Sequence, residues 1–236
     1  MSEDGDRDGG GRFYGVRRIR ETFDGIAEDF DRTRTKAWPE CIRVAETIPS
    51  GSMLLDLGCG NGRNMAFLAR RHRVIGLDIS RRMLALARRN VEKERVLENC
   101  AFIESDMHQL PIADSRADFV FFIAALHHVP SEEGRLRCMG EVRRVLRPDG
   151  RALVSVWALD QPKFERLMNE REAGKAGPGD VVLHWKRKDG KTFERLYHLF
   201  LGGELDRLVA ASGLTVESSF KSNDNYYAIA RRSAKD

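Results

Sequence analysis

Between residues 52 and 158 the sequence alternates short apolar segments with longer amphipathic ones. Branched and aromatic apolar residues dominate the short segments, which favours strands at 52–58, 73–80, 100–106, 117–125 and 151–158. Helical spacing of apolar residues fills the intervals, at 62–72, 81–94 and 131–146. The fourth apolar segment is apolar almost throughout, which suits a strand buried on both faces. Strands that alternate with helices in this way predict a parallel, doubly wound α/β sheet.

Length and composition indicate a single globular protein. The 236 residues suffice for one large α/β domain with a full core and are few for two. Hydrophobic residues make up 42% and charged residues 32%, as in an ordinary soluble protein. No apolar run approaches the ~20 residues of a membrane span, and the polar N-terminus lacks the apolar core of a signal peptide. We therefore expect a cytoplasmic protein without membrane contact.

The cysteines give no sign of a metal centre. They are widely spaced and form no CxxC pair, which argues against a zinc site or a disulfide framework. They are Cys41, Cys59, Cys100 and Cys138. We expect reduced thiols and no bound metal. The net charge of +4 is compatible with an anionic partner but too small to indicate one.

The rest of the chain divides into a tail and one domain. Residues 1–12 are rich in Gly and Asp without periodicity, which predicts a disordered tail. We assign 13–236 to a single domain that starts with two helices, within about 13–48. The polar, basic stretch at about 159–196 breaks the alternation, so we interpret it as an insertion. The chain then adds a helix and two strands, at 203–212, 214–220 and 225–232.

A glycine-rich segment, LLDLGCGNGRN, joins the first predicted strand to a helix. Gly58, Gly60 and Gly62 let the backbone turn tightly and approach a ligand closely where that helix starts. A purely structural turn can carry the same glycines. Two carboxylates favour a ligand site: Asp78 ends the second strand, where it can accept both hydroxyls of a ribose. Asp106 follows the third strand and can accept from an adenine amino group.

The glycine spacing distinguishes between cofactors. A dinucleotide loop carries G-x-G-x-x-G, which sets a helix N-terminus against a pyrophosphate. This chain has G-x-G-x-G within D-L-G-C-G-N-G, a form that resembles motif I of the class I S-adenosyl-L-methionine (AdoMet) methyltransferases. The pairs Asp78–Ile79 and Asp106–Met107, and the strand end at Ala124, match that superfamily's motifs in order and spacing.

This resemblance implies the fold, the cofactor and the residues that bind it. The fold would be the class I methyltransferase (Rossmann-like) α/β fold, a seven-stranded, mostly parallel sheet with helices on both faces. The last two predicted strands would form its antiparallel part. The cofactor would be AdoMet, and the residues expected to bind it are Asp56, Gly58, Gly60, Asn61, Asp78, Ile79, Asp106, Met107 and Ala124.

Five further blocks resemble a narrower family. They are IAEDFDRTRTKAWP (26–39), ALHHV (125–129), VWALDQ (156–161), LYHLFLGGEL (196–205) and NYYAIARR (225–232). Together they look like the tRNA wobble-uridine carboxymethyl methyltransferases, over roughly residues 13–232. Members of that family use AdoMet to esterify the 5-carboxymethyl group of a modified uridine in the tRNA anticodon loop.

The resemblance implies three site residues. The family's substrate-handling arginine falls on Arg34, whose planar fork suits a carboxylate; the alternative is a solvated surface arginine. His128 carries over as an active-site residue that can hydrogen-bond uracil or shield the carboxylate, whereas we expect His127 only to pack. Trp157 would stack on the flipped wobble base, and its alternative is a core tryptophan.

Two departures and several basic residues bear on substrate contacts. The family's VPW stands here as LHW, at 183–185, and its lid tyrosine stands as Phe23. Basic residues near the N-terminus and in the insertion can track tRNA phosphates, although such runs are more often solvated faces. They are Arg12, Arg17, Arg18, Arg20, Lys186, Arg187, Lys188 and Lys191.

The resemblance also implies a protein partner. The family works with a small zinc-containing activator subunit that adds a strand to the sheet edge. In class I order the third strand forms that edge, and Cys100 to Ile103 make it apolar enough to need cover. We therefore expect such a subunit to dock there.

Two other functions remain open. A small-molecule methyltransferase of the quinone-biosynthesis type would share the AdoMet motifs but would not need TRTKAWP or VWALDQ. An RNA-binding or scaffold protein could keep the fold without activity, but intact glycines with Asp78 and Asp106 argue against it.

Overall fold

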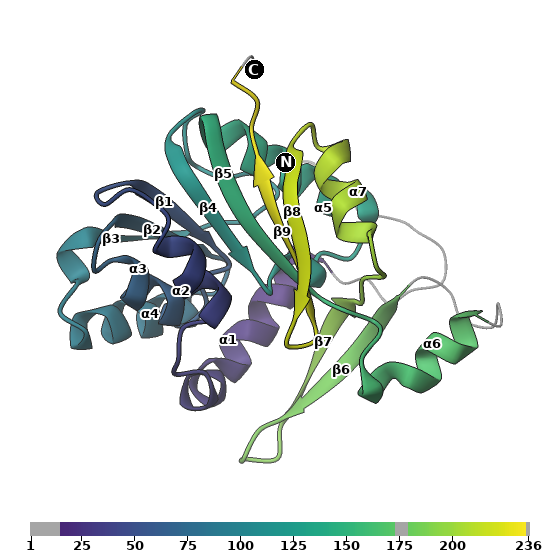
Figure 1. Cartoon of the computed structure of the whole chain (residues 1–236). Helices are drawn as coiled ribbons and strands as arrows, with labels where there is room; N and C mark the ends of the chain where they lie inside the picture. Colours follow the sequence, from purple (N-terminus) through teal and green to yellow (C-terminus); the bar gives the residue numbers. More distant parts are fainter. Residues whose placement is uncertain (1–14, 173–178, 235–236) are drawn as a thin grey trace, which may run out of the picture.

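A computed structural model describes residues 15–172 and 179–234. Its main body is a seven-stranded sheet with the strand order β3-β2-β1-β4-β5-β9-β8 (Figure 1). The strands are β1 Met53–Leu57, β2 Arg73–Asp78, β3 Cys100–Glu104, β4 Ala117–Ile123, β5 Leu146–Trp157, β8 Thr215–Ser222 and β9 Asn225–Arg231. The first five pair in parallel, and β9 pairs antiparallel with both β5 and β8. The predicted sheet is thereby confirmed, with β3 at one edge. The predicted tail, residues 1–12, lies outside the described residues.

Helices cover both faces of this sheet. They are α1 Val16–Thr33, α2 Pro39–Ala45, α3 Arg63–Leu68, α4 Arg81–Lys93, α5 Glu132–Val145, α6 Glu165–Glu172 and α7 Glu204–Ala211, with 3-10 turns η1 Leu97–Asn99, η2 Leu126–His128 and η3 Pro162–Phe164. None of the helices in the described part of the chain has the length and apolarity needed to cross a bilayer.

Alternating side chains of β4 divide the core between the two faces. Phe119 and Phe121 pack with apolar residues of α2, α3 and α4, while Val120 and Phe122 pack with those of α5 and α7. All four side chains are buried. Successive residues of a strand point to opposite faces, so a continuous apolar run is what a strand covered on both faces requires.

The start of β5 differs from the expectation. We expected a turn at 147–150 and a strand from Arg151, but β5 begins at Leu146, which pairs with Ala117. The next pair is Arg151 with Phe119, so the intervening residues of β5 bulge out of the ladder. Asp149 has a φ of +62° there. The turn residues therefore act as a bulge inside the strand.

The insertion contains structure that the sequence pattern did not reveal. Strands β6 Asp180–Lys186 and β7 Thr192–His198 form a separate antiparallel hairpin. Figure 1 shows it beyond the carboxyl ends of the parallel strands, next to α1. Thr22 Oγ1 of α1 donates to the backbone oxygen of Glu194 in β7, at 3.1 Å. The hairpin and α1 thus flank the end of the sheet where ligands bind in doubly wound folds.

Candidate active site

The glycine loop between β1 and α3 is closed around Asp78. The Gly60 N–H donates to Asp78 Oδ2 at 2.8 Å, and the Ser80 N–H donates to Oδ1 at 2.9 Å. Gly58, Gly60 and Gly62 have φ values of +67°, +53° and +75°, a region that strongly favours glycine. The structure therefore brings the predicted loop and Asp78 together through direct hydrogen bonds.

Asp56 and Asp78 form an electrostatically costly pair behind this loop. Asp56 is 1% exposed, and its Oδ2 has no hydrogen-bond partner within the described residues. Burial, and then the charge of Asp78, raises the pKa of Asp56 to about 7. Burial also raises the pKa of Asp78 to about 6, against the hydrogen bonds from Ser80 and Gly60. A buried carboxylate oxygen without a donor indicates a site built for a hydrogen-bonding ligand.

The other predicted cofactor residues surround the same loop. A Cβ on Gly58 would lie 2.5 Å from the Ala125 Cβ and 4.0 Å from the Met107 Cε. Asp106 Oδ1 accepts from the backbone N–H of His108 at 3.0 Å and lies 2.6 Å from its Nδ1. Ala124 takes a φ of +52° and donates its N–H to Ser155, while Ile79 is buried. Their contacts with the cofactor stay a prediction.

Asn61 links the glycine loop to the segment that carries Arg34. Its Nδ2 donates to Asp31 Oδ1 at 2.9 Å and to the Arg34 carbonyl at 2.8 Å. Asn90 and Arg89 of α4 also donate to Asp31. Although burial opposes them, these hydrogen bonds and the charge of Arg89 lower the pKa of Asp31. The Arg34 backbone is thus tied to the loop, so the predicted cofactor and substrate residues meet in one region.

The side chain of Arg34 lies among aromatic rings. Its guanidinium carbon is 5.4 Å from the Phe30 ring centroid and 5.3 Å from that of Trp185, and one nitrogen donates to Thr33 Oγ1 at 2.7 Å. The residue is half-buried. Trp185, the last residue of LHW, therefore contacts the predicted substrate arginine.

Four rings converge where β4, β5 and β7 end. Trp157 stacks on Tyr197, with centroids 4.4 Å apart, and Tyr197 lies 4.5 Å from His128 and 5.0 Å from His127. Phe23 of α1 packs edge-on against His128 at 5.0 Å. Tyr197 is buried, as expected of a packing residue. It joins the predicted residues His128 and Trp157 into one cluster.

The two histidines have opposite tautomers. His128 Nδ1 lies 2.8 Å from the Leu196 carbonyl, which can only accept, so Nδ1 carries the proton and Nε2 keeps a lone pair. His127 Nδ1 accepts the Trp157 N–H at 3.1 Å, which leaves its proton on Nε2. Burial lowers the pKa of His128 to about 4 and pushes that of His127 well below its usual value. Both rings are neutral at neutral pH.

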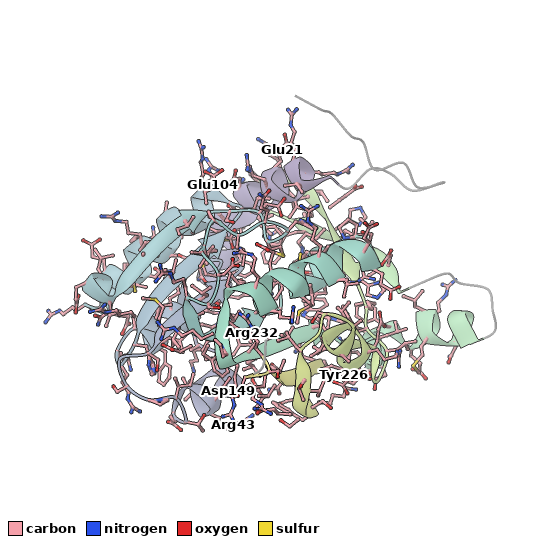
Figure 2. The ribbon with its side chains drawn as sticks, turned by 90° about the horizontal axis from the view of Figure 1, so that it is seen from above. Glu21, Arg43, Glu104, Asp149, Tyr226 and Arg232 are labelled. Atoms are coloured by element: carbon pink, nitrogen blue, oxygen red, sulfur yellow. The ribbon has the colours of Figure 1, made fainter. Side chains whose placement is uncertain are left out.

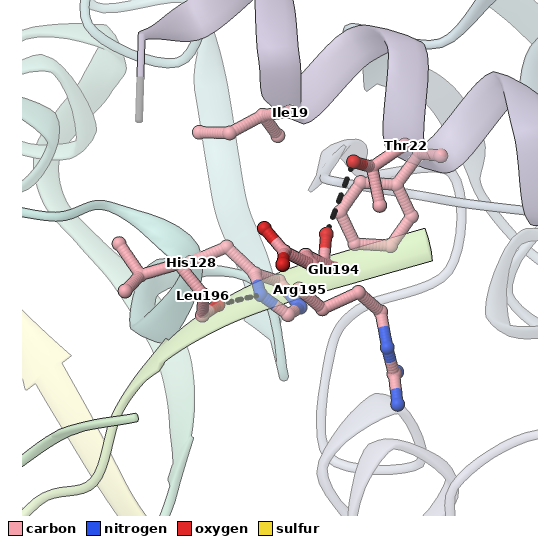
Figure 3. Close-up of a pocket in the computed structure, with 7 residues that line it drawn as sticks. Ile19, Thr22, His128, Glu194, Arg195 and Leu196 are labelled. Atoms are coloured by element: carbon pink, nitrogen blue, oxygen red, sulfur yellow. Dashed lines mark hydrogen bonds between the residues drawn. The ribbon is translucent and has the colours of Figure 1, made fainter. Parts of the chain in front are cut away.

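A small pocket lies behind His128, between α1 and β7. Figure 3 shows Ile19, Thr22, Glu194 and Leu196 around it. The Arg195 side chain extends away from His128, toward the other face of the hairpin.

The chain is similar in sequence to known methyltransferases. The family described as "Methyltransferase domain" matches residues 54–150. A tRNA (carboxymethyluridine(34)-5-O)-methyltransferase from Schizosaccharomyces pombe is 31% identical over 234 residues, covering 91% of this chain and 96% of the relative. The chain therefore belongs to the tRNA carboxymethyluridine methyltransferase family. A relative with the same activity name from Arabidopsis thaliana is 34% identical over 61% of this chain, but the match spans only 33% of that longer protein.

Solved structures share the fold of the family. "DhpI-SAM-HEP complex" superposes with a TM-score of 0.73 at 23% identity, over 94% of this chain and all of that one. A chain from the complex between the Haloferax volcanii Trm112 methyltransferase activator and the putative methyltransferase gives a TM-score of 0.67 at 16% identity, over 91% of this chain and 97% of that one. At these identities the likeness concerns the fold alone.

Several basic residues proposed for tRNA phosphates have protein partners. In α1, Arg17 pairs with Glu21, Arg18 with Glu194, and Arg20 with Glu104 at 3.3 Å. Figure 2 shows Glu21 and Glu104 on the same side of the molecule. In the hairpin, Arg187 pairs with Asp189, whereas the three lysines at 186, 188 and 191 are exposed. Arg12 lies outside the described residues.

Two side chains at the site escaped the sequence prediction, which had noted Trp185 only as part of LHW. They are Lys163, whose Nζ lies 4.0 Å from the Trp157 ring centroid, and Arg195 of the hairpin. Arg195 directly precedes the quoted block LYHLFLGGEL, and that position was the available signal. In the described part of the chain no three His, Cys, Asp or Glu side chains are grouped to hold a metal.

Proposed function

We propose that this protein transfers a methyl group from AdoMet to the carboxylate of 5-carboxymethyluridine, or a related modified uridine, at the tRNA wobble position. Its membership of the carboxymethyluridine methyltransferase family supports this, since a relative with that name matches over nearly its whole length. The observation that carries the proposal is the place of Arg34: a half-buried guanidinium between two rings, tied through Asn61 to the glycine loop. Such a group suits an anionic acceptor beside the cofactor.

The residues of the loop suit AdoMet. The three glycines form the left-handed turns of the loop, Asp78 offers a carboxylate for ribose hydroxyls, and Asp56 has an unpaired buried oxygen. We propose that Asp56, Gly58, Gly60, Asn61 and Asp78 hold the cofactor. Four further residues would complete the site: Ile79, Asp106, Met107 and Ala124.

The chemistry asks little of a general base. The cofactor supplies a methyl group whose bond to sulfur breaks as the bond to the carboxylate oxygen forms, leaving a neutral thioether and moving no proton. The protein then has to align the two groups and exclude water. The lowered pKa values of His127 and His128 are compatible with such a reaction, because the transfer requires no side chain to take up a proton.

The ring cluster supports the placement of the uridine. We propose that Trp157 stacks on the base, backed by Tyr197, once the Lys163 side chain moves off the Trp157 ring. His128 would accept a hydrogen bond at Nε2, for instance from the uracil N3–H, because its Nδ1 proton is held by Leu196. In this arrangement residues 13–236 form one domain, with about 13–48 as a lid and about 159–196 as a basic insertion on the substrate side.

The decisive test is methyl transfer from labelled AdoMet to bulk tRNA and, in parallel, to a lipid extract. We expect label in tRNA, a methyl ester at the wobble nucleoside by mass spectrometry, and its loss with Arg34→Ala. Label in lipid alone would instead support a small-molecule methyltransferase of the quinone-biosynthesis type. Full tRNA activity of Arg34→Ala would contradict the assigned role of that arginine.

A small zinc-containing activator subunit is the second part of the proposal. Strand β3 forms an edge of the sheet, and Cys100, Phe102 and Ile103 on it are only partly buried. An apolar edge strand of this kind favours strand addition by a partner. The chain also resembles a protein solved with the Haloferax volcanii Trm112 activator.

The edge can be tested with matched variants. Ala101 is exposed on β3, and Thr215 is exposed on β8 at the opposite edge. Ala101→Asp should weaken copurification with a co-expressed zinc-binding activator, because a charge at the edge opposes strand addition. Thr215→Asp serves as the control. A chain that is monomeric and fully active alone would contradict the need for a subunit.

A further inference from the structure

A second arginine shares the ring that Arg34 contacts. Arg195, in the middle of β7, places its guanidinium carbon 4.8 Å from the centroid of Trp185 and 5.1 Å from that of Tyr197. One of its nitrogens donates to the Tyr197 hydroxyl. Arg34, which directly follows α1, lies 5.3 Å from the same Trp185 ring, so two guanidinium groups contact one ring, and the charge of Arg34 acts on Arg195. Their charges meet next to the proposed place of the uridine.

Neither guanidinium is neutralised within the described residues. No acidic side chain in 15–169 or 179–234 lies within ion-pair distance of Arg34 or Arg195. The Nε of Arg195 is buried and has no acceptor in that part of the chain. By contrast, Arg144 on α5 has both Glu141 and Asp114. Two cations on one ring, neither with an acidic partner and one with a buried donor that has no acceptor, favour the binding of an anion.

The charges of Arg34 and Arg195 also favour the binding of an anion. Burial lowers the pKa of Arg195, and the charge of Arg34 lowers it further. Arginine nevertheless keeps its proton at neutral pH, so the two positive charges repel each other until an anion binds. An oxyanion between them would relieve that repulsion and supply the missing acceptor.

We propose that Arg195 is a specificity-determining residue that, together with Arg34, binds the carboxylate of the acceptor uridine. This inference rests on the proposed function and adds a second cation to it. A carboxylate has two oxygens with about four acceptor directions, so it can serve two planar forks at once. The pair would favour the acid over its uncharged amide or ester, which gives the enzyme a reason to release its own product.

The experiment compares two anticodon stem-loop RNAs that differ in one group. One carries 5-carboxymethyluridine at the wobble position, and the other carries the neutral amide, 5-carbamoylmethyluridine. Affinities are measured for the full chain, together with its activator subunit if one is needed. The wild type should prefer the carboxylate RNA. Arg195→Gln should lower that preference about 10- to 100-fold, as expected for charge-assisted hydrogen bonds, and should leave AdoMet affinity unchanged.

Two further variants make the result specific. Arg195→Lys keeps the charge but loses the fork, so it should retain part of the preference; retained AdoMet affinity shows that either variant is folded. Arg70→Gln is the matched control, because Arg70 also lies over a ring, Phe67 at 5.9 Å, and pairs with exposed Glu94. It should behave as the wild type.

Each remaining outcome has one meaning. An unchanged preference in Arg195→Gln overturns the inference, and an equal loss for both RNAs does so too, because it assigns Arg195 to a backbone phosphate. If the wild type fails to methylate the carboxylate RNA, the proposed function itself is wrong. If the wild type methylates the carboxylate RNA and Arg195→Gln keeps the preference for it, only the proposed role of Arg195 is wrong.

Discussion

Replacing Gly62 by alanine should destabilise the protein through the contact between α3 and α4. Gly62 precedes α3 with a φ of +75° and a ψ of +15°. A Cβ there would lie 2.8 Å from the Ala87 Cβ and 2.9 Å from its Cα. Ala87 is a fully buried residue of α4, so the added methyl group meets backbone that cannot rotate away. The two helices would have to separate.

The cost has three parts. A left-handed conformation costs an alanine ~1–2 kcal/mol, and one extra carbon in a packed core costs ~1–3 kcal/mol. Alanine also has fewer conformations than glycine in the unfolded chain, which stabilises the folded protein by ~0.4–1 kcal/mol. The net loss in the free energy of unfolding is about 3 kcal/mol. For a chain of this size it corresponds to a fall of roughly 6–12 °C in melting temperature.

Gly51 provides the control, since it has a φ of +83° and open space around its Cβ position. Gly51→Ala should lower the free energy of unfolding only through the left-handed conformation, by ~1–2 kcal/mol. The same restriction of the unfolded chain offsets part of this loss. Thermal unfolding followed by circular dichroism measures both variants. A melting temperature for Gly62→Ala no lower than that of Gly51→Ala would refute the role of the Ala87 contact.

Three further measurements test other parts of the structure. Although burial lowers it, the pKa of His198 is raised by the hydrogen bonds that its ring donates to the carboxylates of Asp180 and Glu204. Its stabilising effect is therefore full below the unfolded pKa of ~6.5 and fades as pH rises through the folded value, so His198→Gln should lower the melting temperature more at pH 6 than at pH 9. With the pKa of Asp78 at about 6, AdoMet affinity, measured by calorimetry, should fall about tenfold per pH unit below that value, and Asp78→Asn should remove this contribution and leave only that of Asp56. Gly140→Ala, in an open position of α5, should raise the melting temperature by about 2–4 °C.

The parallel sheet was predictable because its strands are apolar on both faces. Residues 117–125 have almost no polar side chain, and only burial between two helical layers explains such a run. The glycine loop was predictable for a related reason, because the left-handed turns at Gly58, Gly60 and Gly62 leave little choice of residue. The edge position of β3 was predicted from the strand order of the class I methyltransferases, which the chain resembles, and it is confirmed.

The hairpin was not predictable in the same way. Strand β6 alternates half-buried and exposed residues without a fully buried one, and β7 carries Glu194 and Arg195 in its centre. A strand that faces a ligand site does not need apolar side chains there, so its periodicity resembles that of a polar loop. For the same reason no pattern in the sequence singled out Arg195, whose partners come from β6 and from its own strand.

The proposed cofactor and substrate parts of the site are therefore formed by different kinds of structure. The sheet and its loops hold the cofactor residues through buried backbone geometry, which a short motif records. The proposed substrate residues come from the end of α1 and from the hairpin, which lie apart in sequence and meet at Trp185. Asn61 is the residue that joins them, because it belongs to the loop and holds the Arg34 carbonyl. Asn61 also donates to Asp31, so one side chain of the loop holds both the last turn of α1 and the backbone of Arg34.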